Sequence, residues 1–183
     1  IEGVVTISVA ETDPVLRVTR REALDEPFRT MIGHLRHEIA HMIWWRLSLR
    51  ADFLDAFRAM FGDERADYGA ALRQHYRAGP PPDWTQRFLT RYASAHPHED
   101  WAESAAHLLH LTDLTDSFVA PGLTSPALPP PGWDPYAEPD PARLLHAGAS
   151  IAMGVNHVNR SMGLADLYPF VLSAPAQQKL AFA

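Results

Sequence analysis

The chain has 183 residues, of which 46% are hydrophobic and none is cysteine, and its formal net charge is −6. This length and composition predict a single globular domain over residues 1–183 with a substantial core. The absence of cysteine excludes disulfides and thiolate metal ligands, and the negative charge disfavours nucleic-acid binding. No apolar stretch has the length of a membrane span and no signal peptide is visible, so we expect a cytoplasmic protein without a membrane partner.

The predicted elements begin with a short β-branched strand at Val4–Val9. A long helix is predicted from Pro27 to Arg50, because apolar residues recur at helical spacing after a proline suited to a first turn. Asp63 is a candidate cap for a later helix. Further helices are predicted over residues 52–61, 64–76, 83–92, 98–114 and 141–162, with a last short helix after Ser173.

Half of the sixteen prolines lie between Pro121 and Pro141, which predicts a proline-rich surface loop over residues 121–141. No internal repeat is present. The predicted fold class is therefore α+β but mainly α, a helical domain with a small N-terminal β layer.

The pentapeptide His37-Glu38-Ile39-Ala40-His41 lies within the long predicted helix. Residues four apart lie above one another on a helix, so the imidazoles of His37 and His41 point to one place and can supply two zinc ligands. Glu38 follows His37 directly, close enough to take a proton from a zinc-activated water. A helix that packs against a core does not carry several histidines without partners, and a metal would be one partner.

A catalytic zinc site needs a third protein ligand. The extension found in metzincins is absent, because Trp44 and Leu47 occupy the positions of its Gly and His. Glu99 and Glu103 share one helix face at a spacing of four, so one could bind the metal while the other orients a ligand histidine. Glu64 is the rival ligand, and spacing alone favours Glu99 over it only modestly.

Other histidines accompany these carboxylates along the chain. His107 and His110 continue the stripe of Glu99 and Glu103, and we expect them to lie on a partly solvated helix face, since one further ligand is sufficient. His98 is directly beside Glu99, and a metal contact from it stays open at this point.

Several segments together resemble the bacterial zinc-binding metallopeptidases of the gluzincin type, over nearly the whole chain except the proline-rich loop. The segments that carry the resemblance are residues 26–30, 33–38, 61–68, 93–97, 99–103, 159–164 and 166–170. The resemblance implies zinc held by His37, His41 and Glu99, with Glu38 as general base and Glu103 supporting a ligand histidine. Longer relatives carry an N-terminal cysteine-bearing zinc-ribbon segment that is absent here, and His98 stands where a large aromatic residue is expected.

These observations predict a zinc-dependent metallopeptidase or amide hydrolase that acts on a peptide or protein substrate. Glu38 would transfer the proton of the zinc-activated water to the leaving amine. The oxyanion needs a donor, for which Tyr168 is the first choice among Tyr168, Asn156, His157 and Arg160. The alternative function is a non-catalytic zinc-binding interaction module that retains the site. The sequence leaves the oligomeric state open.

Overall fold

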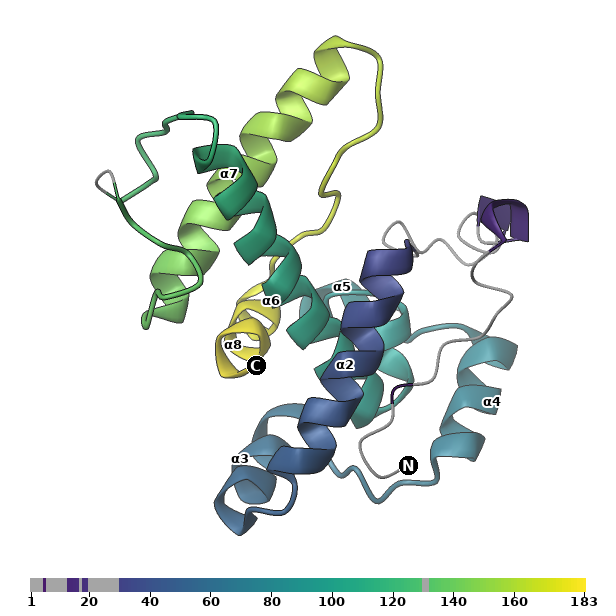
Figure 1. Cartoon of the computed structure of the whole chain (residues 1–183). Coiled ribbons are helices and arrows are strands. Elements are labelled where there is room, and N and C mark those ends of the chain that lie inside the picture. Colours follow the sequence, from purple (N-terminus) through teal and green to yellow (C-terminus); the bar gives the residue numbers. More distant parts are fainter. Residues whose placement is uncertain (1–4, 6–12, 17, 20–29, 130–131) are drawn as a thin grey trace.

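The computed structural model describes residues 5, 13–16, 18, 19, 30–129 and 132–183, which form a helical assembly around one long central helix (Figure 1). The central helix is α6, and α2, α7 and α8 pack against it. In chain order the elements are α2 (Met31–Leu47), α3 (Ala51–Phe61), α4 (Tyr68–Ala78), α5 (Trp84–Arg87), the 3-10 helix η2 (Tyr92–Ala95), α6 (Pro97–Val119), α7 (Pro141–Ser161) and α8 (Ala174–Phe182).

The predicted fold class is wrong in its β component. The residues that the structure describes form helices, turns and loops, and no strand or sheet is found among them. The predicted strand Val4–Val9 lies outside the described residues except for Val5, which belongs to no regular element. A strand needs a neighbour to satisfy its backbone amides and carbonyls, whereas the described helices satisfy their own. The described fold is therefore all-α.

Helix α2 carries the His-Glu-Ile-Ala-His segment. It begins after Thr30, whose hydroxyl accepts a 3.0 Å hydrogen bond from the backbone N–H of Gly33 and caps the helix. The predicted start at Pro27 lies outside the described residues. Apolar side chains surround this helix instead of forming one face, and its buried residues are Gly33 and Ala40. The helix is therefore only half-buried, so its histidines can face both α6 and solvent.

Helix α6 is the longest helix described, and it begins with Pro97 at its first position, after the cap residue His96. It runs to Val119, five residues beyond the predicted end at Leu114. Its contact with α2 is fixed by the buried indole of Trp101, whose Nε1 donates a 2.9 Å hydrogen bond to the carbonyl oxygen of Ala40. This bond lies beside His41 and sets the register between the two helices that carry the site.

The apolar core has two parts, one at each end of α6. The first lies between α2, α3 and the start of α6, and its buried members are Ala40, Phe57, Phe61, Trp101, Ala102 and Ala105. The second lies between the end of α6, α7 and α8, and its buried members are Leu89, Leu111, Leu145, Ala152, Tyr168, Ala176 and Leu180. Both clusters exclude water from α6 and hold it rigidly against its neighbours.

Other element boundaries differ in part from the prediction. Helix α4 begins at Tyr68 and is capped by Asp67, because the carboxylate of Asp63 is bound instead by the guanidinium of Arg65 at 2.7 Å. Of the helix predicted over residues 83–92, only Trp84–Arg87 (α5) is α-helical, and the 3-10 helix η2 begins where the prediction ends, at Tyr92. The described residues between α6 and α7 form turns and irregular structure, and Pro141, the last residue of the predicted loop, is the first residue of α7. Ser173 caps α8 as predicted.

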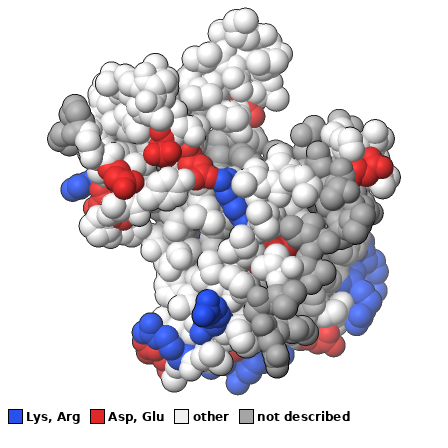
Figure 2. Space-filling model, viewed as in Figure 1, with Lys and Arg blue, Asp and Glu red and all other residues white. Residues whose placement is uncertain are grey.

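On the face shown in Figure 2, basic residues lie in separate groups and most of the described surface is uncharged. A search of the described residues finds no helix with the length and apolar character needed to cross a membrane.

Candidate metal centre

His37 and His41 lie one turn apart on α2 and turn their rings toward the same point. Their ring centroids are 4.8 Å apart with the planes nearly perpendicular, and their Nε2 atoms are 3.1 Å apart. Two imidazole nitrogens brought this close together present lone pairs that a cation could share. This arrangement follows directly from the i, i+4 spacing on a helix.

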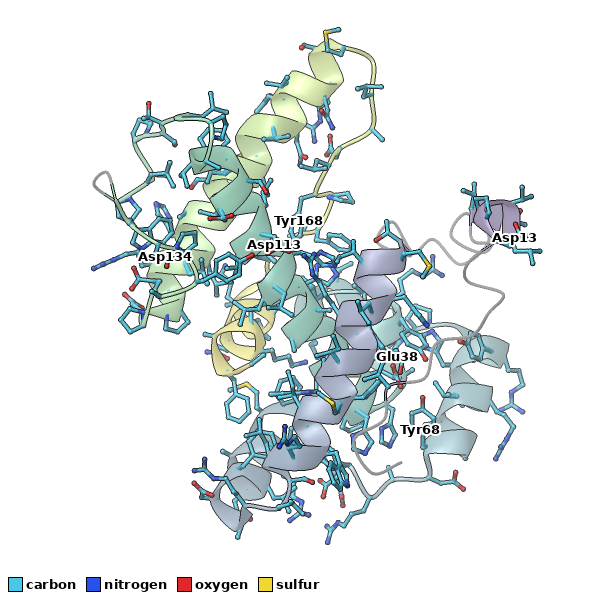
Figure 3. The ribbon with its side chains drawn as sticks, viewed as in Figure 1. Asp13, Glu38, Tyr68, Asp113, Asp134 and Tyr168 are labelled. Atoms are coloured by element: carbon cyan, nitrogen blue, oxygen red, sulfur yellow. The ribbon has the colours of Figure 1, made fainter. Side chains whose placement is uncertain are left out.

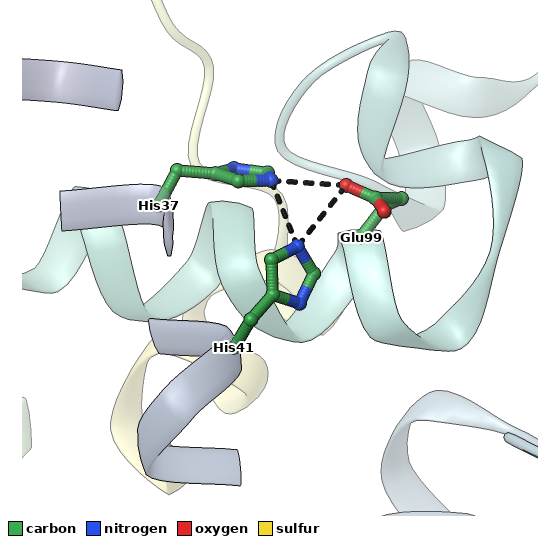
Figure 4. A group of neighbouring side chains, drawn as sticks. All are labelled: His37, His41 and Glu99. Atoms are coloured by element: carbon green, nitrogen blue, oxygen red, sulfur yellow. Dashed lines mark hydrogen bonds and ion pairs between the residues drawn. The ribbon is translucent and has the colours of Figure 1, made fainter. Parts of the chain in front are cut away.

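Glu99 completes a triangle of donor atoms from the first turn of α6 (Figure 4). Its Oε2 lies 3.0 Å from Nε2 of His37 and 3.6 Å from Nε2 of His41. The side chain is only 1% exposed, so its carboxylate is turned inward toward α2. The positive end of the α6 helix dipole also favours a carboxylate at this position.

The spacing of these three donors fits a tetrahedral zinc ion. Ligand atoms bound to zinc at about 2.0–2.1 Å in a tetrahedron are separated from one another by about 3.3 Å. The three observed separations are 3.0, 3.1 and 3.6 Å. Two histidines and one carboxylate are also the donor set of known catalytic zinc sites with an open fourth position. Both the types of donor atom and their spacing therefore fit a zinc ion.

Glu103 lies one turn beyond Glu99 on α6 and contacts the opposite side of the His37 ring. Its Oε1 is 2.7 Å from Nδ1 of His37, the ring nitrogen that does not face Glu99. Burial disfavours the charged imidazole, but the bonds to Glu103 and Glu99 outweigh it and raise the pKa of His37 to about 10. Both ring nitrogens of His37 are therefore held, and the ring orientation is fixed.

Two tyrosines, which the sequence analysis did not single out, border the triangle. The hydroxyl of Tyr68 donates a 2.6 Å hydrogen bond to Oε1 of Glu99, and the ring of Tyr92 lies 6.0 Å from that of His37. Burial, together with the Glu99 carboxylate, raises the pKa of both tyrosines above its usual range. Both are thus neutral hydroxyl donors near neutral pH. Tyr68 belongs to a segment that carries the family resemblance, which is the sequence signal that could have indicated it.

Glu38 lies on α2 between the two histidines, on the side facing α4 and Tyr68 (Figure 3). Its side chain is 28% exposed, and its Oε1 lies 3.7 Å from Nε2 of His34. It also lines a pocket of about 440 Å³ that passes between α2, α5 and α6. A carboxylate beside the donor triangle, with access to solvent, is placed to accept a proton from water.

The comparisons with known proteins agree with this geometry. The sequence model of a family described as "putative zinc-binding metallo-peptidase" matches residues 1–183. The chain belongs to this family. It is 42% identical over 188 residues to uncharacterized proteins of Mycobacterium tuberculosis strain H37Rv and of Mycobacterium bovis. Each of these alignments covers 98% of this chain and 53% of the relative. The chain thus spans about half the length of the curated relatives it matches. No solved structure matches.

For this member of the zinc-binding metallo-peptidase family, the structure places Tyr168 away from the donor triangle. Tyr168 is buried in the second core cluster, with its hydroxyl 3.0 Å from Nδ1 of His107 (Figure 3). The side chain of Asn156 holds the backbone of Tyr168 from both sides: its Oδ1 accepts a hydrogen bond from the N–H of Tyr168, and its Nδ2 donates one to the carbonyl oxygen of Tyr168. The role of Tyr168 as oxyanion donor stays a prediction, and it would require the hydroxyl to leave His107.

The remaining candidates are bound elsewhere in the chain. Glu64, the rival third ligand, forms an ion pair with Arg58 at 2.5 Å, and Arg160 pairs with Asp166. His98 packs edge-on against the indole of Trp44 with ring centroids 4.1 Å apart, and burial lowers its pKa to about 4. The described metal-ligand group contains neither Glu64 nor His98.

His107 and His110 differ from the prediction. Both are buried, so the expected solvated face is wrong. The reason is that the C-terminal segment covers this part of α6: the ring of Phe170 lies 4.4 Å from that of His107. Helix α2 covers the other side, where Arg36 approaches Nδ1 of His110 at 2.5 Å.

Proposed function

We propose that this chain is a zinc-dependent metallopeptidase that hydrolyses peptide or amide bonds. The observation that carries the proposal is the triangle of His37, His41 and Glu99, whose separations of 3.0, 3.1 and 3.6 Å match the edges of a tetrahedral zinc site. Glu38 beside this triangle gives the site a general base, which a purely structural metal site does not need.

Each residue near the triangle has a separate task in this proposal. His37, His41 and Glu99 would hold zinc through Nε2, Nε2 and Oε2. Glu103 would fix the tautomer and orientation of His37 through Nδ1, and Tyr68 would hold the second oxygen of Glu99. When bound, zinc lowers the pKa of a coordinated water and polarises a carbonyl group.

The proton transfers fall to Glu38. Its carboxylate accepts a proton from the attacking water and passes this proton to the leaving amine. The partial exposure of Glu38 leaves room for substrate and water beside it. Because the carboxyl group both receives and releases the proton, it is restored at the end of each turnover.

The test is Glu38→Gln, which keeps the size and polarity of the side chain but removes the base. We expect full zinc content, an unchanged melting temperature and a loss of at least about 100-fold in the rate at which a mixed peptide pool is cleaved. Glu64→Gln is the matched control, since Glu64 pairs with Arg58 outside the site. Cleavage by the Glu38→Gln variant at the parental rate would refute the role of Glu38. If parent and variant bind zinc but leave every peptide intact, the non-catalytic zinc-binding module replaces the enzyme.

A further inference from the structure

The pocket of about 440 Å³ begins at His37 and Glu38 and extends under α2 toward the C-terminal segment. One wall comes from α5 and the residues after it, another from α6, and a third from residues 169–171. Its apolar lining includes Trp84, Phe88, Leu89, Ala106, Phe170 and Val171. The volume lies in the range of about 300–1,000 Å³ typical of small-ligand sites. The pocket is therefore large enough for one bulky side chain and the backbone next to it.

The inner end of the pocket is polar, and the charged groups beside it are already paired: Arg36, next to His110, forms an ion pair with Asp113. His107 and His110 line it, and burial lowers the pKa of His107 to about 4 and that of His110 to about 3. Both imidazoles are consequently neutral at physiological pH. The carboxylate of Glu103, which also lines the pocket, is bonded to His37. A charged group entering this space would lose its water and would have to compete with these existing pairs for a counter-ion.

The walls are held in place by contacts that also reach the metal centre. Nζ of Lys179 lies 4.3 Å from the centre of the Phe88 ring and donates a 2.9 Å hydrogen bond to the carbonyl oxygen of Arg87. The same ammonium group forms a buried ion pair at 2.6 Å with Asp100, the residue after Glu99. The wall formed by Phe88 is thus tied to the first turn of α6, so the pocket is formed before any ligand binds.

We propose that this pocket binds a bulky uncharged side chain, aromatic or long aliphatic, of the substrate residue adjacent to the bond that faces Glu38. The inference rests on the proposed function, because it assumes that the substrate lies across Glu38. Three observations support it: the pocket starts at the proposed general base, its walls are mainly aromatic and aliphatic, and Glu103 and Arg36 at its inner end are already bound to His37 and Asp113. Small and charged side chains are correspondingly disfavoured.

The experiment measures binding instead of turnover, by titration calorimetry on the zinc-loaded chain with two probes. Acetohydroxamate carries only a metal-binding group, and 3-phenylpropionohydroxamate adds a phenyl ring that can reach the pocket. Burial of the ring should make the phenyl compound bind about 10–100-fold more tightly. Phe88→Ala should remove most of this gain, and Thr85→Trp should do so by filling the pocket from an exposed rim position. Neither variant should change the affinity for acetohydroxamate.

Trp45→Ala is the control, because this aromatic side chain is exposed on α2 and does not line the pocket. It should keep the full gain of the phenyl probe. Equal affinity of the parent for both probes would overturn the pocket proposal and leave the metal centre intact. A gain that survives both Phe88→Ala and Thr85→Trp would overturn it as well. If neither probe binds the zinc-loaded chain, the proposed function fails together with the pocket.

Discussion

The hydroxyl of Tyr68 donates a 2.6 Å hydrogen bond to Oε1 of Glu99, the oxygen that does not face the two histidines. Glu99 is thus held from two sides, by Tyr68 through Oε1 and by His37 through Oε2. Burial, together with this bond, raises the pKa of Tyr68 and keeps it a hydrogen-bond donor. Since Tyr68 is the first residue of α4, the bond also connects that helix to the metal centre.

Tyr68→Phe should therefore weaken zinc binding without removing it. The loss of a partner that orients a ligand typically costs about 10–100-fold in metal affinity. The affinity can be measured by competition with a chromophoric chelator. Helix α4 should persist because its cap, Asp67, is unchanged, and circular dichroism would show this. A variant that binds zinc as tightly as the parent would mean that Glu99 needs no help from Tyr68.

Glu103→Gln should lower zinc affinity by a similar factor of about 10–100, because the carboxylate on Nδ1 of His37 fixes the ring and increases its basicity. Asp116→Asn is a control on the same helix, away from the triangle. The zinc affinities of both variants can be measured by competition with a chelator. Equal affinities for the two variants would contradict the proposed role of Glu103.

Glu99→Ala should abolish stoichiometric zinc, since two histidines alone make an incomplete site. Glu64→Ala should retain one zinc per chain, because Glu64 is bound to Arg58. Elemental analysis of protein purified without added metal distinguishes them. If Glu99→Ala retains zinc and Glu64→Ala loses it, the third zinc ligand is Glu64 and not Glu99.

The free energy of unfolding of the metal-free chain should depend on pH through His107 and His110. Their pKa values in the folded chain, about 4 and about 3, lie below the usual 6.5, so the unfolded chain binds protons that the folded chain does not. The stabilising contribution of these two imidazoles is then complete above about pH 6.5 and falls as the pH decreases toward 4, with a slope approaching about 1.4 kcal/mol per pH unit for each of them. Urea titrations at several pH values measure this slope.

His107→Gln should reduce that slope, because glutamine does not titrate but can still bond to the hydroxyl of Tyr168. His157→Gln is the control for replacing an imidazole by an amide at an exposed position on α7. A slope that is identical in the parent and in His107→Gln would show that His107 is protonated in the folded chain.

The sequence was sufficient wherever a local pattern determines the structure. The spacing of His37 and His41 fixes their common direction on any helix, and the spacing of Glu99 and Glu103 does the same on α6. Ser173 was identified as a cap because capping is a property of adjacent residues.

Features that depend on distant contacts could not be predicted in this way. Tyr68 forms a hydrogen bond with Glu99, which is 31 residues away in the sequence, and no local sequence pattern predicts that bond. The expectation that His107 and His110 lie on a partly solvated helix face is wrong because the sequence does not show that Phe170 and α2 cover them. The start of α4 was misplaced because Asp63 binds Arg65 instead of capping the helix, a competition between two local contacts.

The positions of Glu99, Glu103, His107 and His110 along α6 have a consequence for how this chain can change during evolution. One helix supplies a candidate ligand, the carboxylate that holds His37, and the inner end of the pocket. A single inserted or deleted residue within this stretch would rotate everything after it by about 100° and disperse all three functions at once. The loop between α6 and α7 has no such register to preserve, so changes of length should accumulate there and be excluded from residues 99–110.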